Sequence, residues 1–398
     1  MKKPTIILGL FILIMLIVPT VSAMDDLDNL TDIQVDGEVI QTDEVIEEIG
    51  EDNGNENLCA PDGSGSSFSD LQILINNHIA DGTPLSLDKE YTFNPDTDSG
   101  LKDGIVINGA ITINGNGYTL NADEQSRIFN LKGSNSKVVL DGINFVNGSA
   151  KSGGAIYQEG STIDLTVNNC KFQDNTAIAE GGAIYSGGKN VKILNSEFTN
   201  NNAQTKGGAV STGDKTNITN SVFKNNNGPG YGGAVSIGAD SVIEESTFIN
   251  NSATNTGGAV NVKKDKNVEI KNSQFIDNTA YNEGGAVKAG AKTIISGSNF
   301  TNNKVDEKNG GAVSVGANSE ISNSNFVNNT SPEKGGAVNL GTKSKVTDST
   351  FTGNTAGSDG GAIYAVSDLS VSSSKFDDNN ATRYGGAILT KNLDIKDS

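Results

Sequence analysis

The chain has 398 residues, a formal net charge of −19 at pH 7 and a single histidine. We do not expect so acidic a chain to bind nucleic acid, because phosphate recognition needs a basic surface. Glycine is abundant at 48 residues and tryptophan is absent. A long polar chain of this kind is either disordered or a repeat architecture that buries a thin, regular core.

The N-terminal part of the sequence predicts an export signal and an acidic leader. Two lysines precede the apolar run TIILGLFILIMLIV, and Val21-Ser22-Ala23 is a small-residue cleavage site, so residues 1–23 are expected to be a signal peptide. A retained membrane anchor is the alternative, but the apolar run is short for a span. Residues 24–65 are expected to form a disordered leader, because 24–57 hold thirteen Asp or Glu and no Lys or Arg.

Residues 66–144 are expected to form an N-terminal cap and the first, irregular coils. In SSFSDLQILINNHIADG, Ser67 and Asp70 fit a capping box, and an apolar stripe precedes Gly82. The spacing predicts one short amphipathic helix over 68–80. Pieces such as ITINGNGYTL and KVVLDGINF alternate as strands do, with Asn-Gly or Asp-Gly at the turns.

Over residues 145–398 the chain repeats itself ten times. Gly-Gly-Ala followed by Ile or Val begins at Gly153, Gly181, Gly207, Gly232, Gly257, Gly284, Gly310, Gly335, Gly360 and Gly385. A phenylalanine recurs at Phe145, Phe172, Phe198, Phe223, Phe248, Phe275, Phe300, Phe326, Phe351 and Phe376. In nine of these ten copies an asparagine follows three residues later. Such order over ten copies indicates a repeat architecture.

The patterned runs within one repeat predict strands. They are too short for helices, and they alternate with period two, which places Val242, Ser246 and Phe248 on one face in GGAVSIGADSVIEESTF. A unit of about 25 residues with three short strands is one coil of a parallel β-solenoid, because each coil can bury its apolar face only against a near-copy. The expected fold class is all-β, a solenoid of such coils with the helix as its cap.

Two residue types are expected to stack from coil to coil. The phenylalanines stack inside the coil, and each following asparagine tolerates a left-handed backbone and can donate its amide to the next coil. This structural ladder includes Phe172, Phe198, Phe223, Phe248, Asn175, Asn201, Asn226 and Asn251. A serine two residues before Phe fills a narrow inward place. Cys170 replaces one such serine and is expected to be a buried thiol rather than the disulfide partner of Cys59.

Taken together, Phe-x-x-Asn and Gly-Gly-Ala-Ile/Val resemble the repeats of chlamydial polymorphic outer-membrane proteins. The lead-in segments FSDLQILIN, ITINGNGYTL and LDGINFVNG more closely resemble adhesin-like surface proteins of methanogenic archaea. The resemblance covers about residues 66–398 and implies an exported right-handed parallel β-helix, with the pectate-lyase-like architecture, that serves in adhesion or as an envelope component. We expect the protein to depart from the bacterial family by having no C-terminal autotransporter barrel. It stops within a repeat at Asp397-Ser398, so a truncated C-terminus is expected.

The repeats do not show the residues of a carbohydrate-active enzyme. Such a site needs neighbouring carboxylates, often Ca²⁺, and a basic residue. Asp174, Asp277 and Asp378 share one repeat position but lie four coils apart, roughly 19 Å at the strand spacing. His78 lies on the cap helix without a partner in the sequence pattern. We therefore expect no catalytic residues, no metal site and no cofactor, with a polysaccharide lyase or hydrolase as the alternative.

Ligand binding is expected at the variable turns before each Gly-Gly, because sequence variation in a solenoid collects on one binding face. Exposed tyrosines in these turns, or directly after the Gly-Gly-Ala-Ile run, could stack on sugars or on a protein partner. Scattered solvated tyrosines are the alternative. The candidate ligand contacts are Tyr157, Tyr185, Tyr231, Tyr281, Tyr364 and Tyr384.

The sequence as a whole predicts a secreted or surface-displayed, non-catalytic adhesin-like or envelope protein. It is expected to bind a cell-surface glycan or protein by weak multivalent contacts along a rigid rod. No nucleic-acid partner is expected, and no membrane span remains after signal cleavage. An inert structural coat is a further alternative.

Overall fold

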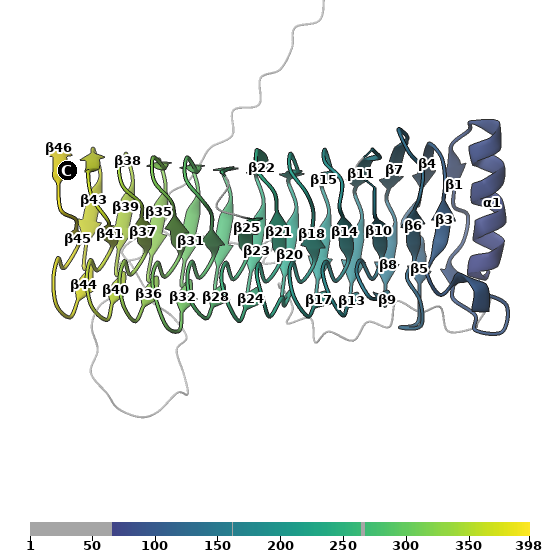
Figure 1. The fold of residues 1–398 in the computed structure, drawn as a ribbon, viewed down its shortest axis with the longest axis horizontal. Helices are drawn as coiled ribbons and strands as arrows, with labels where there is room; N and C mark the ends of the chain where they lie inside the picture. The colour runs from purple at the N-terminus through teal and green to yellow at the C-terminus, as the bar shows by residue number, and fades with distance from the viewer. Residues whose placement is uncertain (1–65, 161, 264–266) are drawn as a thin grey trace, which may run out of the picture. The chain divides into compact units, whose positions relative to one another are not determined.

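The computed structural model describes residues 66–160, 162–263 and 267–398. The expected signal peptide (1–23) and acidic leader (24–65) lie outside the described residues. In the described part, one helix is followed by short strands that stack coil on coil, and every strand pairing is parallel (Figure 1). The prediction of a parallel β-solenoid with one helix at its N-terminal end is confirmed.

Helix α1 (Phe68–Asp81) lies across the end of the stack beside the first strands (Figure 1). Its N-cap is Ser67, which forms the predicted capping box with Asp70, and Gly82 ends the helix in the left-handed conformation at φ 66°. The side chains that α1 buries are Phe68, Leu71 and Ile75. The helix thus covers the apolar end of the first coils.

A buried carboxylate, Asp98, fastens the start of this helix to the loop before the short 3₁₀ helix η1 (Ser99–Leu101). It accepts hydrogen bonds from the backbone N–H groups of Phe68 (2.9 Å), Ser69 (2.9 Å) and Asn94 (2.8 Å). Burial raises the pKa of Asp98, but these hydrogen bonds outweigh that effect and hold the pKa below its ordinary value. The carboxylate also satisfies helix N–H groups that have no partner within the helix.

The coils contribute strands to three long parallel sheets, called the long sheet, the Gly-Gly sheet and the Phe sheet. The long sheet contains β1 (Leu85–Ser86), β4 (Ile111–Asn114), β7 (Lys137–Asp141), β11 (Asp164–Asn168), β15 (Lys192–Leu194), β19 (Asn217–Thr219), β22 (Ser241–Glu244), β26 (Val268–Lys271), β30 (Ile294–Ser296), β34 (Glu320–Ser322), β38 (Ser344–Thr347), β42 (Leu369–Ser372) and β46 (Leu393–Lys396). The Gly-Gly sheet contains β3 (Ile105–Ile107), β6 (Phe129–Leu131), β10 (Ile156–Gln158), β14 (Ile184–Ser186), β18 (Val210–Ser211), β21 (Val235–Ile237), β25 (Val260–Val262), β29 (Val287–Lys288), β33 (Val313–Val315), β37 (Val338–Leu340), β41 (Ile363–Ala365) and β45 (Ile388–Leu389). The Phe sheet contains β2 (Tyr91–Thr92), β5 (Thr119–Asn121), β8 (Asn144–Val146), β12 (Lys171–Gln173), β16 (Glu197–Thr199), β20 (Val222–Lys224), β23 (Thr247–Ile249), β27 (Gln274–Ile276), β31 (Asn299–Thr301), β35 (Asn325–Val327), β39 (Thr350–Thr352) and β43 (Lys375–Asp377).

Two-residue strands after the Phe sheet form two smaller sheets. The first contains β9 (Ser149–Ala150), β13 (Thr176–Ala177) and β17 (Asn202–Ala203). The second contains β24 (Ser252–Ala253), β28 (Thr279–Ala280), β32 (Lys304–Val305), β36 (Thr330–Ser331), β40 (Thr355–Ala356) and β44 (Asn380–Ala381). These short strands lead into the turns that precede each Gly-Gly pair.

The phenylalanines form one continuous stack in the core. Phe198 pairs in register with Phe172 on one side and Phe223 on the other. From Phe145 to Phe376, successive ring centroids lie 4.6–5.0 Å apart, with interplanar angles of 1–6°. This spacing matches the ~4.8 Å between neighbouring strands, so backbone pairing sets the ring stacking.

The ladder asparagines are buried, and their side-chain amides bridge three coils. The Nδ2 of Asn201 donates to Oδ1 of Asn226 (3.0 Å) and to the backbone carbonyl of Phe172 (2.9 Å), and its Oδ1 accepts from Nδ2 of Asn175 (3.0 Å). The left-handed residue is the preceding Asn200 (φ 58°), not the ladder asparagine. The expectation of a left-handed ladder residue is therefore wrong; the turn before it aims the amide into the core.

One predicted face is also wrong, because a turn interrupts the alternation. Ser246 and Phe248 are buried as expected, but Val242 is only half-buried and its neighbour Ile243 points into the core. Glu245 adopts a left-handed backbone (φ 51°) between β22 and β23. Each strand keeps its period of two, but the turn resets which parity faces inward.

The inward serines form a second ladder. The Ser221 hydroxyl accepts a hydrogen bond from the backbone N–H of Ser196 (3.1 Å) and donates to the carbonyl of Thr219 (2.9 Å). Cys170 occupies the same place as a buried free thiol, and burial raises its pKa to about 12. Cys59 lies outside the described residues.

Candidate binding surface

Two neighbouring columns of variable side chains run along the outer face of the Gly-Gly sheet. The first consists of the residue before each Gly-Gly pair, and backbone bridges join Glu180, Lys206, Tyr231, Thr256 and Glu283 in that order. The second consists of the outward residue after Gly-Gly-Ala-Ile/Val, and strand pairing aligns Tyr157, Tyr185, Ser211, Ser236, Asn261 and Lys288. The scaffold therefore places a different pair of side chains on each coil, of which Ser211 and Ser236 are buried.

The glycine pairs bring these columns together. At Gly207 the backbone is left-handed (φ 60°), and a Cβ there would lie 2.1 Å from the carbonyl oxygen of Val210. At Gly208 a Cβ would lie 2.0 Å from the carbonyl oxygen of Gly233 in the next coil. Only glycine fits this tight turn, which places side chains from either side of it in contact.

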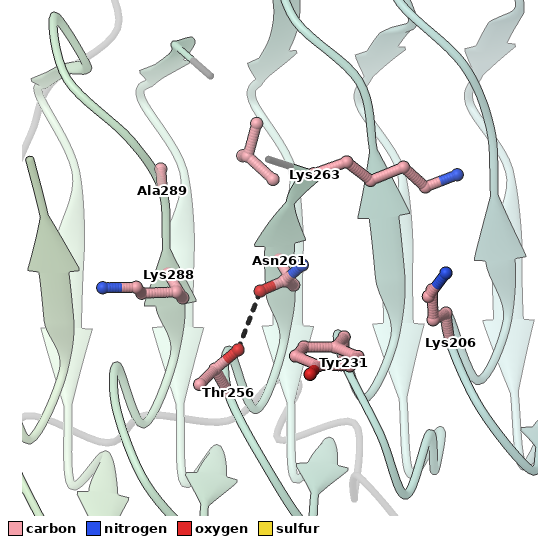
Figure 2. Close-up of a pocket in the computed structure, with 8 residues that line it drawn as sticks. Lys206, Tyr231, Thr256, Asn261, Lys263, Lys288 and Ala289 are labelled. Atoms are coloured by element: carbon pink, nitrogen blue, oxygen red, sulfur yellow. Dashed lines mark hydrogen bonds between the residues drawn. The ribbon is translucent and has the colours of Figure 1, made fainter. Parts of the chain in front are cut away.

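Each coil is numbered by its Gly-Gly pair and the residue before it, with Gly153 in coil one and Gly207 in coil three. A pocket of about 560 Å³ opens between the two columns on coils three to six (Figure 2). Its lining residues are Lys206, Tyr231, Thr256, Asn261, Val262, Lys263, Lys288 and Ala289. The Thr256 hydroxyl donates to the Asn261 amide oxygen (2.9 Å) across the floor of the pocket (Figure 2). The volume lies within the range of small-molecule sites.

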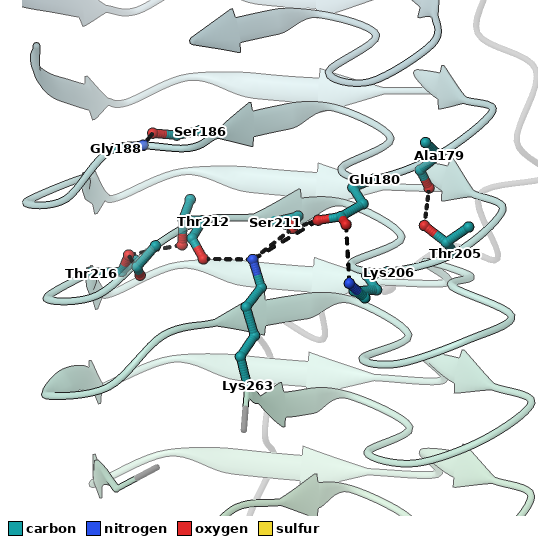
Figure 3. Close-up of polar contacts among 11 residues, drawn as sticks. Ala179, Glu180, Ser186, Gly188, Thr205, Lys206, Ser211, Thr212, Thr216 and Lys263 are labelled. Atoms are coloured by element: carbon teal, nitrogen blue, oxygen red, sulfur yellow. Dashed lines mark hydrogen bonds and ion pairs between the residues drawn. The ribbon is translucent and has the colours of Figure 1, made fainter. Parts of the chain in front are cut away.

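A charged network borders the pocket (Figure 3). Glu180 accepts hydrogen bonds from Lys206 Nζ (3.1 Å) and the Ser211 hydroxyl (2.9 Å), and Lys263 Nζ lies 3.9 Å away. Lys263 extends back across two coils to reach this group, where its Nζ also donates to the Thr212 carbonyl (3.0 Å). Side chains from coils two, three and five thus meet at one carboxylate.

Burial and charge have opposite effects within this network. Burial raises the pKa of Glu180, but hydrogen bonds from Lys206 and Ser211 and the nearby lysine charges lower it further than burial raises it. Burial lowers the pKa of Lys263 below its ordinary value, although the charge of Glu180 opposes the shift. Glu180 is therefore a carboxylate at neutral pH, and Lys263 is partly stripped of water.

On the other side of the pocket, Lys288 contacts Glu283 (2.5 Å) and the Ser314 hydroxyl (3.2 Å). Among the described residues, the ion pairs of the three pocket lysines involve only Glu180 and Glu283. Asp214, whose charge also acts on Lys263, lies 4.0 Å from Lys189. The pocket therefore carries a local excess of positive charge on a chain with a net charge of −19.

The predicted tyrosines do not form one continuous row. Tyr157 and Tyr185 stack on adjacent coils, with ring centroids 5.4 Å apart, and the Arg127 guanidinium lies 4.5 Å from the Tyr157 centroid. Tyr231 lines the pocket and is 40% exposed. The stacked pair and the pocket are thus two separate aromatic sites on the same sheet face.

The remaining three tyrosines lie apart from the pocket. Tyr364 packs under Lys334 Nζ at 4.6 Å, and Tyr384 lies beside the Arg383 guanidinium at 5.2 Å. Tyr281 sits in a different part of its turn and donates its hydroxyl to Glu307 (2.7 Å). In the described part of the chain, none of these three rings stacks on another tyrosine ring.

Sequence reasoning missed the pocket lysines. Lys263 follows β25 at a position that is glycine in six other coils, namely Gly187, Gly213, Gly238, Gly290, Gly316 and Gly341. Lys206 and Lys288 each occupy one of the two columns. An alignment of the coils alone could have marked Lys263, but its reach across two coils depends on the three-dimensional stack.

Three further features concern the described part of the chain. There, no three His, Cys, Asp or Glu side chains converge as metal ligands. Asp174, Asp277 and Asp378 each occupy a left-handed turn, at φ 50–55°, in well-separated coils. Across the same residues, we find no helix of the length and apolar character that a membrane crossing requires.

Comparison with known families places these coils in a defined class. Residues 207–381 match the family model described as a right handed beta helix region, and residues 169–187 and 195–213 match the Chlamydia polymorphic membrane protein repeat. The described coils form a right-handed parallel β-helix, and two segments of them are similar to the polymorphic-membrane-protein repeat. No curated protein sequence matches the chain.

Solved structures with a similar arrangement have different functions. The surface adhesin PfbA of Streptococcus pneumoniae is 12% identical, with a TM-score of 0.43, covering 83% of this chain and 91% of that one. The A-module of the mannuronan C-5 epimerase AlgE4 of Azotobacter vinelandii is 10% identical, with a TM-score of 0.37, covering 82% and 96%. The Agl-KA catalytic domain is 14% identical, with a TM-score of 0.40, covering 85% and 69%.

Proposed function

We propose that this protein is a cell-surface binding protein, a non-catalytic β-helical rod that contacts glycans or protein partners through several weak sites on the Gly-Gly sheet. The repeats of polymorphic-membrane-protein type support a place at the cell surface. Export through residues 1–23, an acidic leader over 24–65, and a cap and first coils over 66–144 are part of the same proposal. The observation that carries it is the pocket containing Tyr231, flanked by variable side chains on an otherwise repeated scaffold.

The buried ladders suit the scaffold to this task. The Phe, Asn and Ser ladders repeat in nearly every coil and hold the backbone in register, so the outward side chains need little ordering when a partner binds. Tyr157 and Tyr185 offer a second aromatic site on the same face. Two weak sites on one rigid body raise the overall affinity when a polymeric ligand can span both.

A polysaccharide lyase or hydrolase is the second candidate, and one observation favours it. Lys263 has a pKa lowered by burial and borders a pocket that also contains Tyr231, and lysine and tyrosine are groups that can move a proton. Among the described residues, Glu180 is the one carboxylate that pairs with Lys263, and Lys206 and Ser211 already hold it. We therefore place binding ahead of catalysis.

The test is binding of the protein to a glycan and cell-surface array, combined with an assay for new reducing ends on the same glycans. We expect saturable binding without product, weakened by Tyr231→Ala and by Tyr185→Ala. Tyr281→Ala is the matched control, because that tyrosine is also exposed but lies outside both aromatic sites. Release of product would support the enzyme instead, and the absence of binding and product would favour an inert coat.

A further inference from the structure

Resting on the proposed function, we infer that the pocket on coils three to six binds a carboxylate-bearing saccharide unit. Lys206 and Lys288 lie at opposite sides of the opening, and the Lys263 side chain extends to the Lys206 side of the same lining (Figure 2). The ring of Tyr231 supplies a surface for the apolar face of a sugar. The inference concerns the chemical class of the ligand, which the proposed function leaves open.

The charge of the pocket favours an anionic group. Three lysines share two carboxylate partners, Glu180 and Glu283. A carboxylate on the ligand could therefore pair with a lysine without displacing either glutamate. The remainder of the chain is strongly acidic and would repel anions elsewhere on the rod. At physiological ionic strength the Debye length is about 8 Å, so a ligand inside the pocket responds mainly to these nearby lysines.

The neutral groups of the pocket favour a ligand rich in hydroxyls. The bond between Thr256 and Asn261 uses the amide oxygen and leaves the Asn261 N–H₂ group without hydrogen bonds to the described residues. The Ser236 hydroxyl, on β21 in the outward column, is buried without a hydrogen-bond partner among those residues. Lys263 bridges from coil five to Ser211 in coil three, and Ser211 pairs in register with Ser236 on the coil between them.

These features fit a saccharide better than an acidic peptide. The side chain of Tyr231 is 40% exposed, so its ring can stack on a sugar. The pocket also combines amide, hydroxyl and ammonium groups, whereas a carboxylate alone would need only the ammonium groups. The lysines act as point charges, without the planar fork with which arginine grips a carboxylate or phosphate. Orientation would then come from the sugar hydroxyls and ring.

The test uses the full chain and isothermal titration calorimetry with three probes. These are a hexamer of galacturonic acid, the same hexamer with its carboxylates reduced to alcohols, and hexaglutamate. The protein variants are Lys206→Gln combined with Lys288→Gln, and Tyr231→Ala. Lys345→Gln is the matched control, because that lysine is exposed on the long sheet. Surface ion pairs contribute little to stability, so unfolding curves of all variants should stay close to that of the parent protein.

We expect the uronic-acid hexamer to bind, the reduced hexamer to bind at least about tenfold more weakly, and the double lysine variant to lose at least about tenfold in affinity. Lys345→Gln should bind like the parent protein. Equal binding of the acidic and neutral hexamers, stronger binding of hexaglutamate, or binding of none of the probes would overturn the inference. The array experiment separates the two proposals. Array binding that the lysine substitutions do not change would contradict only the assignment of an acidic saccharide. Absence of any array binding by the parent protein would contradict the proposed function.

Discussion

Replacing Phe248 with alanine tests whether the aromatic stack holds the coils together. Its side chain is fully buried, and its ring centroid lies 4.8 Å from that of Phe223 and 4.9 Å from that of Phe275. Phe→Ala in a core costs about 3–5 kcal/mol, because the cavity left behind collapses only in part. Neighbouring coils held in register by backbone bonds leave little room for collapse, so we expect a value in the upper half of that range.

The measurement is urea unfolding of Phe248→Ala and of the parent protein, followed by circular dichroism. A shifted midpoint at constant slope reports a change in stability. Phe376→Ala is the matched control: that ring is partly exposed and stacks on Phe351 alone, so its loss should cost less than half as much. A cost below about 1 kcal/mol for Phe248→Ala, or equal costs at the two positions, would refute the reasoning, since a stacked core predicts a larger cavity in mid-rod.

Three further predictions concern individual buried groups. Asn226→Asp places a charge in the amide ladder and removes the donor to the Phe198 carbonyl. It should lower the free energy of unfolding by about 3–5 kcal/mol at pH 8 and by less at pH 5. In the same unfolding assay, Asn325→Asp at an exposed position should be nearly neutral. Because the pKa of Asp98 is lowered in the folded state, the stability that Asp98 provides is complete above about pH 4 and is lost as the pH falls through the folded pKa. The loss of stability caused by Asp98→Asn should therefore become smaller on acidification. A loss of stability that does not depend on pH would contradict the assignment. With its pKa raised to about 12, Cys170 should resist iodoacetamide at pH 8 until the protein unfolds, and rapid labelling of the folded chain at this residue, read by peptide mass spectrometry, would show that the thiol is not buried as described.

Much of the scaffold could be predicted because it follows local rules. The Ser67 capping box, the Gly82 stop and the ten glycine pairs each need a residue type that few alternatives can replace. The repeat also predicts which residues stack, since equivalent positions such as Phe172, Phe198 and Phe223 align when coils pair in register. The predicted inward place of Ser246 and Phe248 follows from the same alternation.

The errors arose where a turn or a long side chain decides the outcome. Alternation across Glu245 predicts an inward Val242, but the left-handed backbone of Glu245 changes which residues of the next strand face the core. The pocket depends on Lys263 reaching Ser211 in a coil 52 residues earlier, and no local pattern encodes that contact. Tyrosines could be picked out by type, but which of them lie near cations or near each other is set by the stack.

The central claim is that the Gly-Gly sheet face binds a surface ligand without altering it. The most direct measurement is array binding of the parent protein, Tyr231→Ala and Tyr281→Ala on cell-surface glycans, with reducing ends counted on the same spots. The account predicts saturable binding that falls with Tyr231→Ala, persists with Tyr281→Ala, and yields no new reducing ends. Binding that survives Tyr231→Ala unchanged, or the appearance of new reducing ends, would contradict it.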